Sequence, residues 1–325
     1  MDFKRLTKEE CAERLMALEA PVAVLMHRRP DGDAVGSATA LVYVLRELGI
    51  RATAISADPV SERLAFLTEG VEKIELCECK SQIAIDVASP PQLGSLLGRV
   101  SPSLMIDHHA VGEAFCDFYT VPDASSAAEV LLDVTDVLIS LGKMKMSTEI
   151  AKRAYAAMSS DTGGFIYSNA TAKTHRRVAE LLGYGIDAAD INHRLFNSKS
   201  EAEIRAEGEV SRSIRVALGG TLAYATLTKK RRDELSLTEE NFECAIDVVR
   251  ALRGAQVALF VRETDDGTLR ASMRSTGVDV AKIAASFSGG GHVRAAGCSP
   301  VARDVDEAAK MIIDEIKRNY GDMLV

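Results

Sequence analysis

The fold is decided by residues 21–37, PVAVLMHRRPDGDAVGS. An apolar run with the length of a buried strand leads into His27, and Asp31 and Asp33 follow before a helical pattern begins. A strand, a polar loop and a helix in this order form the first half of a βαβ unit, which indicates a parallel sheet. Because Pro30 and Gly32 favour a tight, non-helical path, we expect the two aspartates to lie on an extended loop.

Three further polar clusters occur in the first half of the chain. Asp86 ends the short run 82–85, the triplet DHH at 107–109 follows the apolar run 104–106, and Asp161 follows a helical pattern. The carboxyl ends of parallel strands lie at one edge of a sheet, so these side chains are expected to converge. Convergent carboxylates and imidazoles repel one another unless cations lie between them. We therefore predict a metal site that holds two ions.

Each cluster also has an ordinary structural explanation. Pro-Asp-Gly-Asp at 30–33 is common turn chemistry, and a single aspartate such as Asp86 or Asp161 often caps a helix or forms a turn. The adjacent histidines His108 and His109 are the most specific signal, because they follow a buried strand directly. Neighbouring residues at a strand end point in different directions, so one histidine can bind a metal while the other faces a substrate.

The composition restricts the class of protein. A chain of 325 residues suits two domains. Its net charge of −8 argues against sequence-independent binding of long nucleic-acid duplexes, which requires a basic surface. The six cysteines show no CxxC spacing, and no apolar run has the length of a membrane span or the character of a signal peptide. We therefore expect reduced thiols in a soluble, cytoplasmic protein.

The order of strand and helix patterns predicts an α/β protein of two domains. In the first part, the two patterns alternate and then become mainly helical, which indicates a mostly parallel sheet covered by helices. A smaller α/β unit follows, with an Asp-Gly hairpin turn at 265–267 and a glycine-rich loop at 288–292. We expect a cleft between the two domains. The predicted boundaries are 1–195 for the first domain, 196–217 for a helical linker and 218–325 for the second domain.

Two features of the second unit indicate contact with an anion. Residues 289–292, Gly-Gly-Gly-His, resemble a loop whose backbone N–H groups surround a phosphate, although such glycines also end helices. Arg274 lies at the end of a predicted hairpin strand, and its guanidinium offers parallel donors that suit a phosphate.

Taken in order, HRRPDGDAVGS (27–37), the Asp86 segment, DHH (107–109) and SSDTGGF (159–165) resemble the four motifs of the DHH phosphoesterases. The stretch 272–297, SMRSTGVDVAKIAASFSGGGHVRAAG, resembles the signature of the C-terminal domain that accompanies them. The two-domain layout is most similar to the nanoRNase and pAp-phosphatase group. RecJ-type exonucleases are similar but longer, and family II pyrophosphatases have a different second domain.

The resemblance implies a set of functional residues at the matching positions. The implied ligands of one ion are His27, Asp31 and Asp86, and those of the other are Asp33, Asp86, His108 and Asp161. The implied catalytic residues are Asp86, Asp107 and His109. The implied substrate-binding residues are Arg274, Ser275, Gly289, Gly290, Gly291 and His292. In this arrangement Asp86 bridges the two ions, Asp107 orients the histidines and His109 faces the scissile phosphate.

The implied activity is an Mn²⁺-dependent, two-metal hydrolysis of short oligoribonucleotides, such as dinucleotides, to mononucleotides, with pAp as a further substrate. Two alternatives stay open: a phosphodiesterase for linear or cyclic dinucleotide signals, such as pApA or c-di-AMP, and a non-catalytic nucleotide sensor. The expected partners are short RNA or small nucleotides, without long duplexes or a membrane. A homodimer is one option for the assembly.

Overall fold

The chain folds into two compact units, Met1–Ser198 and Lys199–Val325. The computed structural model describes residues 3–110, 112–242 and 245–324. No helix within these ranges is long and apolar enough to cross a bilayer.

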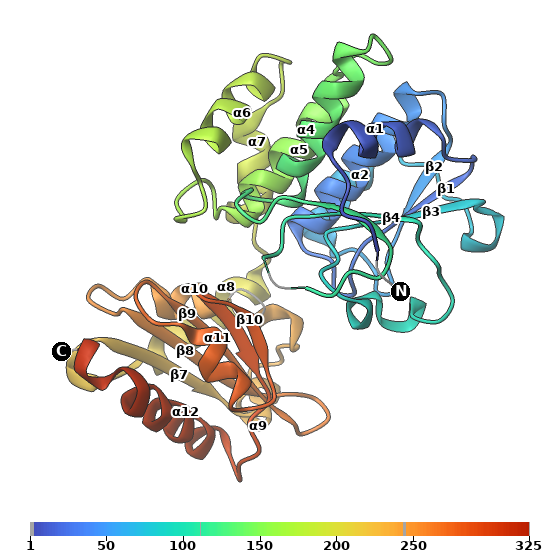
Figure 1. Cartoon of the computed structure of the whole chain (residues 1–325). Coiled ribbons are helices and arrows are strands. Elements are labelled where there is room, and N and C mark those ends of the chain that lie inside the picture. Colours follow the sequence, from blue (N-terminus) through green and yellow to red (C-terminus); the bar gives the residue numbers. More distant parts are fainter. Residues whose placement is uncertain (1–2, 111, 243–244, 325) are drawn as a thin grey trace. The chain divides into compact units, whose positions relative to one another are not determined.

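The first unit contains a five-stranded sheet in which every pair of neighbouring strands is parallel, as the alternating patterns predict (Figure 1). The strand order is β2-β1-β3-β4-β5. The strands are β1 (Val22–Leu25), β2 (Ala52–Ile55), β3 (Ser81–Ile85), β4 (Leu104–Asp107) and β5 (Asp117–Thr120). The helices are α1 (Lys8–Met16), α2 (Gly32–Glu47), α3 (Ala65–Thr68), α4 (Ala127–Ser140), α5 (Thr148–Asp161), α6 (Ala172–Leu182) and α7 (Ala188–Asn192). Short 3₁₀ turns cover Glu62–Leu64, Leu76–Glu78 and Pro90–Leu96, and a π-helical turn covers His193–Asn197.

Both faces of this sheet are buried, and strand β1 illustrates how. Val22 and Val24 belong to the large core formed with α2, α4 and α5, whereas Ala23 and Leu25 pack on the opposite face. That second face is covered by the 3₁₀ segment Pro90–Leu96, whose Leu93 packs there. A parallel strand that is covered on both sides is apolar at successive positions, which explains the uninterrupted apolar run in the sequence.

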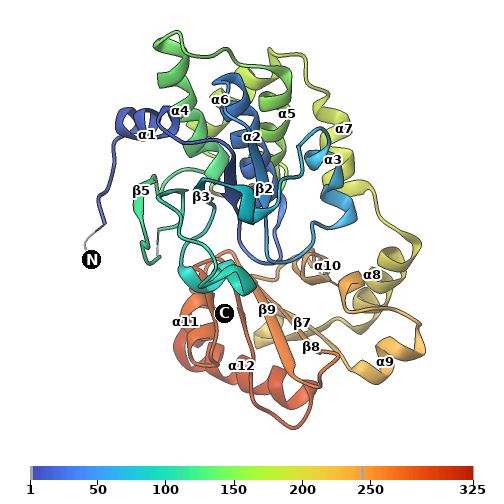
Figure 2. The ribbon, with the colours of Figure 1, turned by 90° about the vertical axis from the view of Figure 1, so that its right-hand side faces the viewer.

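The second unit contains a six-stranded mixed sheet, in the order β10-β11-β9-β8-β7-β6. The pair β7–β8 is parallel and the other neighbouring pairs are antiparallel. Its strands are β6 (Arg215–Ala217), β7 (Leu222–Leu227), β8 (Val257–Glu263), β9 (Leu269–Ser275), β10 (Gly290–His292) and β11 (Ala295–Cys298). Its helices are α8 (Glu201–Ser213), α9 (Lys229–Glu234), α10 (Ala245–Arg250), α11 (Val280–Ala285) and α12 (Val305–Tyr320). The sheet lies between α11 and α12 on one face and α8 and α10 on the other (Figure 2).

The helix predicted as part of a linker packs within the second unit. Ala206 and Val210 of α8 are buried in the core that α10 and strands β7 and β8 form. Helix α8 ends at Ser213, and edge strand β6 follows it. A 3₁₀ turn (Glu240–Phe242) precedes α10 in the described residues. Cys244 lies outside the described residues, and the other five cysteines are free thiols.

The glycine-rich segment at 288–292 is not the loop that its composition predicts. Three of its residues form β10, which pairs with β11, a strand that the sequence patterns did not indicate. A Cβ atom on Gly289 would lie 2.2 Å from the carbonyl oxygen of Gly297, and one on Gly291 would lie 2.6 Å from that of Ala295. The glycines are therefore required where two backbones approach closely.

Close contact between α2 and α5 depends on two further glycines. A Cβ atom on Gly36 would lie 2.8 Å from the Cβ of Ala157, and one on Gly32 would lie 2.2 Å from the Oγ of Ser160. The start of α2 and the end of α5 consequently lie side by side. This contact places the aspartates at the start of α2 near Asp161, the last residue of α5.

Alanine substitutions at two helical glycines should have opposite effects on stability. Gly36→Ala is expected to destabilise the protein by about 1–3 kcal/mol, because the added methyl group overfills the α2–α5 contact. A Cβ added at Gly208, inside α8, would meet no heavy atom within 4 Å among the described residues beyond its chain neighbours and the backbone of its own helix, so Gly208→Ala should stabilise by about 0.5–1 kcal/mol. Chemical denaturation of both variants measures the two signs, and stabilisation by Gly36→Ala would contradict the close contact.

Candidate metal centre

Three adjacent strands of the first unit carry polar residues at their carboxyl ends. Strand β3 lies between β1 and β4, and all three run in parallel. His27 follows β1, Asp86 follows β3 directly, and the Asp107–His109 triplet begins in the last position of β4. The topology therefore brings together at one edge of the sheet the clusters that the sequence predicted to converge.

The two aspartates after His27 do not lie on an extended loop. Asp31 is the N-cap of α2, and its carboxylate accepts hydrogen bonds from the backbone N–H groups of Asp33 (3.1 Å) and Ala34 (3.0 Å). Asp33 lies in the first turn of the helix, which begins at Gly32, directly after the cap. The sequence signal for this cap was present, since an aspartate is a preferred N-cap residue.

The ring of His27 is oriented by its own loop. Its Nδ1 lies 2.8 Å from the carbonyl oxygen of Arg28 and must be the donor, because a carbonyl oxygen can only accept. In the neutral ring, the lone pair on Nε2 then faces Asp31 Oδ1 at 3.7 Å and Asp86 Oδ2 at 3.6 Å. These separations are long for hydrogen bonds. They match the spacing of about 3–4 Å between ligands that each lie roughly 2.1 Å from a shared cation.

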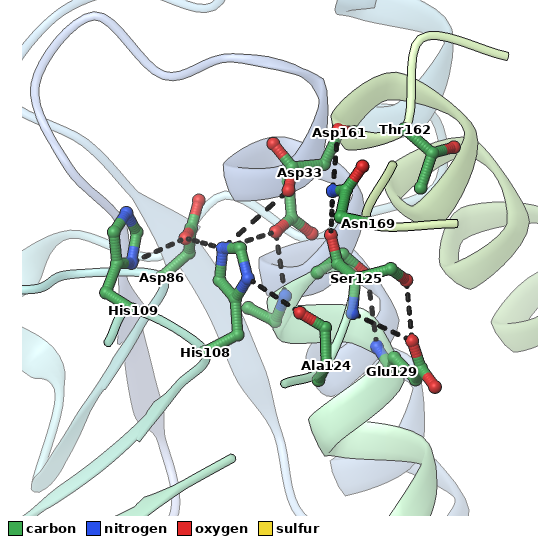
Figure 3. A network of polar contacts seen from close by, with 12 residues as sticks. Asp33, Asp86, His108, His109, Ala124, Ser125, Glu129, Asp161, Thr162 and Asn169 are labelled. Atoms are coloured by element: carbon green, nitrogen blue, oxygen red, sulfur yellow. Dashed lines mark hydrogen bonds and ion pairs between the residues drawn. The ribbon is translucent and has the colours of Figure 1, made fainter. Parts of the chain in front are cut away.

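His108 repeats this arrangement with Oδ1, the other carboxylate oxygen of Asp86 (Figure 3). Its Nδ1 lies 3.3 Å from the carbonyl oxygen of Ala124, which again makes Nδ1 the donor. Its Nε2 faces three carboxylates: Asp86 Oδ1 at 3.6 Å, Asp33 Oδ2 at 3.7 Å and Asp161 Oδ2 at 3.9 Å. A metal-binding histidine usually donates a hydrogen bond from its second ring nitrogen to a group such as a backbone carbonyl.

Asp86 has two features that folding alone does not explain. Its φ angle is +56°, a conformation that costs free energy for a residue with a side chain. Its carboxylate is buried, and Oδ1 has no hydrogen-bond partner within the described residues. Its two oxygens face different histidines, as the preceding distances show. A strained backbone and an unpartnered buried oxygen both point to a bound cation.

The electrostatics of the metal-free cluster lead to the same conclusion. Burial and the charges of Asp86 and Asp161 hold the pKa of Asp33 well above its ordinary value. Burial also raises the pKa of Asp161 to about 7. Burial opposes protonation of His27, but the neighbouring carboxylates of Asp31 and Asp86 outweigh it and raise the His27 pKa to about 11. The same pairing lowers the pKa of Asp31 to about 2 despite burial. In the metal-free cluster, bound protons therefore balance part of the negative charge that cations would balance when bound.

Asp107 and His109 form a separate pair beside these ligands. Asp107 Oδ1 accepts hydrogen bonds from the backbone N–H of His108 and from Nδ1 of His109, both at 2.8 Å. Burial opposes protonation of His109, but the hydrogen bond to Asp107 raises the His109 pKa to about 9. Asp107 therefore contacts both histidines, and its carboxylate favours the protonated form of His109.

The sequence patterns did not indicate three residues behind the ligands. Glu129 is buried and accepts hydrogen bonds from the backbone N–H and the hydroxyl of Ser125, and Asn169 donates to the carbonyl oxygens of Ser125 and Asp161. The motif Ser126-x-x-Glu129 is a recognisable capping signal. It would have drawn attention to Glu129 but suggested a bond back to Ser126, whereas the carboxylate bonds to Ser125.

The predicted substrate-binding residues belong to the second unit. Arg274 lies opposite Ala295, which in turn lies opposite His292, so the three residues occupy one row across β9, β11 and β10. Neighbouring strands are about 4.8 Å apart, so about 10 Å separate the backbones of the outer two residues. Ser275 Oγ accepts hydrogen bonds from the N–H groups of Gly277 (3.1 Å) and Val278 (2.6 Å) and so stabilises a turn. The side chain of His292 lies outside the described part of the structure.

Comparison with known proteins agrees with this fold. The model of the DHH family N-terminal domain matches residues 21–158, and that of the DHHA1 domain matches residues 219–318. A solved exopolyphosphatase-related protein from Bacteroides fragilis has the same fold, with a TM-score of 0.85 over 98% of this chain and 97% of its own, at 24% identity.

The chain belongs to the DHH family. Within the family it is 31% identical to the bifunctional oligoribonuclease and PAP phosphatase NrnA of Thermus thermophilus, over 94% of this chain and 92% of the relative. It is also 25% identical to the cyclic-di-AMP phosphodiesterase GdpP of Geobacillus thermodenitrificans, over 93% of this chain but only 48% of that protein.

Proposed function

We propose that this protein is a two-metal phosphoesterase that hydrolyses short oligoribonucleotides, and also pAp, to mononucleotides. The observation that carries the proposal is Asp86, whose two oxygens face different histidines while one of them has no partner within the described residues. A carboxylate in this position suits a bridge between two cations. The similarity to NrnA over nearly the whole of both chains supports the choice of substrate.

The ligand sets suit two divalent ions, for which we propose Mn²⁺. One set combines His27, Asp31 and Asp86, and the other combines Asp33, Asp86, His108 and Asp161. Carboxylates with some imidazole and without thiolate favour Mn²⁺ over softer ions. When bound, such ions lower the pKa of a water molecule and stabilise the charge that develops on phosphorus.

His109 is proposed to provide the proton for the leaving group. Asp107 raises the pKa of His109, and its hydrogen bond to Nδ1 fixes the plane of the ring. The same nitrogen lies 3.7 Å from Asp86 Oδ1, so the imidazolium lies beside the proposed bridging carboxylate. A ribose hydroxyl is a poor leaving group without a proton, and a cationic donor next to the metal ligands can supply it.

The second unit is proposed to hold the end of the substrate away from the reacting phosphate. The row formed by Arg274, Ala295 and His292 has a small residue, alanine, in the middle. The glycines of β10 would let a phosphate approach its backbone closely. A short substrate requires few basic contacts, which agrees with the net charge of −8.

A substrate panel tests the proposal. Purified protein with Mn²⁺ is incubated with a ribodinucleotide, a longer single-stranded RNA, pAp, pyrophosphate, pApA and c-di-AMP, and the products are separated by chromatography. We expect the highest kcat/KM with the dinucleotide and measurable release of phosphate from pAp. Preference for c-di-AMP or pApA would favour the signalling phosphodiesterase that the similarity to GdpP suggests. Binding without turnover of any compound would favour a nucleotide sensor.

Arg274→Ala is expected to lower kcat/KM for the dinucleotide by about ten- to a hundredfold, because a charge-assisted contact to phosphate contributes about 1.5–3 kcal/mol. It should leave both ions bound and change hydrolysis of a small chromogenic phosphodiester by less than about threefold. Steady-state kinetics with both substrates, together with metal analysis, measures this difference. Arg270→Ala, four residues earlier on the same face of β9, is the matched control. Equal losses on both substrates would contradict a role confined to substrate binding.

A further inference from the structure

Three ligands of one proposed ion are hydrogen-bonded, directly or through Asn169, to one short segment at the start of α4, residues 124–127. Asp33 Oδ2 accepts a hydrogen bond from the backbone N–H of Ala127 at 2.7 Å, and His108 Nδ1 donates to the carbonyl oxygen of Ala124 at 3.3 Å. Asn169 joins the carbonyl oxygens of Ser125 and Asp161, both at 3.1 Å (Figure 3). All three terminal ligands of this ion are therefore connected to four consecutive residues.

The ligands of the other proposed ion are held elsewhere. His27 donates a hydrogen bond to the carbonyl oxygen of Arg28. Asp31 accepts hydrogen bonds from backbone N–H groups in the first turn of α2. A displacement of segment 124–127 should therefore disturb one ion and leave the terminal ligands of the other in place. Asp86 is the shared ligand, and its position depends on strand β3.

The side chain of Glu129 accepts two hydrogen bonds from segment 124–127. Its side chain is 1% exposed, and Oε2 accepts hydrogen bonds from the N–H of Ser125 (2.9 Å), the hydroxyl of Ser125 (2.6 Å) and the hydroxyl of Thr174 in α6 (3.1 Å). Its other oxygen, Oε1, is buried without a hydrogen-bond partner within the described residues. The ammonium group of Lys173 lies 3.8 Å from Oε1, which is an ion-pair distance but too long for a hydrogen bond.

An ordinary helix-packing role does not account for Glu129. Contact between α4 and α6 is already provided one turn further along α4, where Asp133 pairs with Lys173 at 2.8 Å and with Arg177 at 2.9 Å. Asp133 makes those pairs in partial contact with solvent, whereas Glu129 is a fully buried carboxylate, one oxygen of which has no hydrogen-bond partner among the described residues. The two bonds to Ser125 are what distinguishes Glu129 from Asp133.

We propose that Glu129 is a positioning residue that sets the geometry of the ion held by Asp33, His108 and Asp161, and not of the ion held by His27 and Asp31. Its carboxylate fixes Ser125. Ser125 fixes the carbonyl of Ala124 that orients His108, and through Asn169 it fixes the end of α5. This inference rests on the two-ion centre of the proposed function. It adds Glu129 as a residue whose loss should weaken the binding of one ion and not of the other.

The test is Mn²⁺ binding to Glu129→Gln, measured by equilibrium dialysis with elemental analysis and by the electron paramagnetic resonance of free Mn²⁺. The wild type should bind two ions per chain. In the variant, we expect one ion to bind about ten- to a hundredfold more weakly, the usual effect of losing a group that orients a metal ligand. The other ion should keep its affinity within about threefold. Asp133→Asn is the matched control, because it weakens the α4–α6 contact and should change neither affinity.

Ser125→Ala provides a second variant that preserves the buried carboxylate. It removes one of the three hydrogen bonds to Oε2, so it should weaken the same ion in the same direction by a smaller factor. His108→Ala identifies the affected ion, since its loss should remove the same binding event. Thermal unfolding of each metal-free variant shows that the comparison is made on folded protein.

The outcomes separate the inference from the proposed function. A wild type that binds no Mn²⁺ overturns the metal centre itself. If both ions keep their affinities in Glu129→Gln and also in Ser125→Ala, the role of Glu129 is overturned and the metal centre stands. Equal weakening of both ions, or the same weakening in Asp133→Asn, also overturns it, because a general packing effect would then explain the result.

Discussion

Replacement of Asp86 by alanine is expected to remove both ions and to lower kcat/KM for a dinucleotide by about a thousandfold or more. This corresponds to a loss of roughly 4 kcal/mol of transition-state stabilisation. The reason is geometric: Oδ2 lies 3.6 Å from His27 Nε2, and Oδ1 lies 3.6 Å from His108 Nε2, so one side chain contributes to both ligand sets. Metal content and steady-state kinetics, measured on the same preparation, check the prediction.

Two further variants separate ligation from the backbone strain at this position. Asp86→Asn preserves the volume and the tolerance of a positive φ angle but removes the negative charge, so it should lose nearly as much activity as the alanine variant. Asp31→Ala should weaken only the ion beside His27, because Asp31 faces that histidine alone. Retention of two tightly bound ions by Asp86→Ala would show that the carboxylate does not bridge them.

Removal of the metal ions should abolish phosphodiester hydrolysis, and Mn²⁺ should restore it better than Mg²⁺ or Zn²⁺. Without cations, Asp33, Asp86 and Asp161 repel one another, and burial and these charges raise the pKa of Asp33 and Asp161. Mn²⁺ should also stabilise the fold, because binding at a hundred times the Kd adds about 2.7 kcal/mol per site.

The measurement combines exhaustive chelation, elemental analysis, the dinucleotide assay and thermal unfolding with and without added metal. Apoprotein refilled with Ca²⁺ is a useful control, since Ca²⁺ binds carboxylates but prefers more and longer oxygen contacts. Full activity in protein shown to contain no metal would contradict a metal-dependent mechanism. A rise in activity without any rise in the unfolding temperature would place the activating ion outside this buried cluster.

The sequence by itself determined the first sheet and the convergence of the clusters on its edge. Strands that are covered on both faces leave long apolar runs, and residues at the carboxyl ends of parallel strands must meet wherever the strands are neighbours. His27, Asp86 and the Asp107–His109 triplet could therefore be placed together before any coordinates were known.

Other features depended on the tertiary structure, because they arise from contacts between segments far apart in the chain. The glycines at 289–291 have the composition of a loop, and only the presence of β11 beside them turns them into a strand. The bond between Asp33 and Ala127 joins residues 94 positions apart, and that between Glu129 and Thr174 joins residues 45 apart. Local patterns report periodicity and capping, whereas the orientation of a ligand is set by whichever distant segment packs against it.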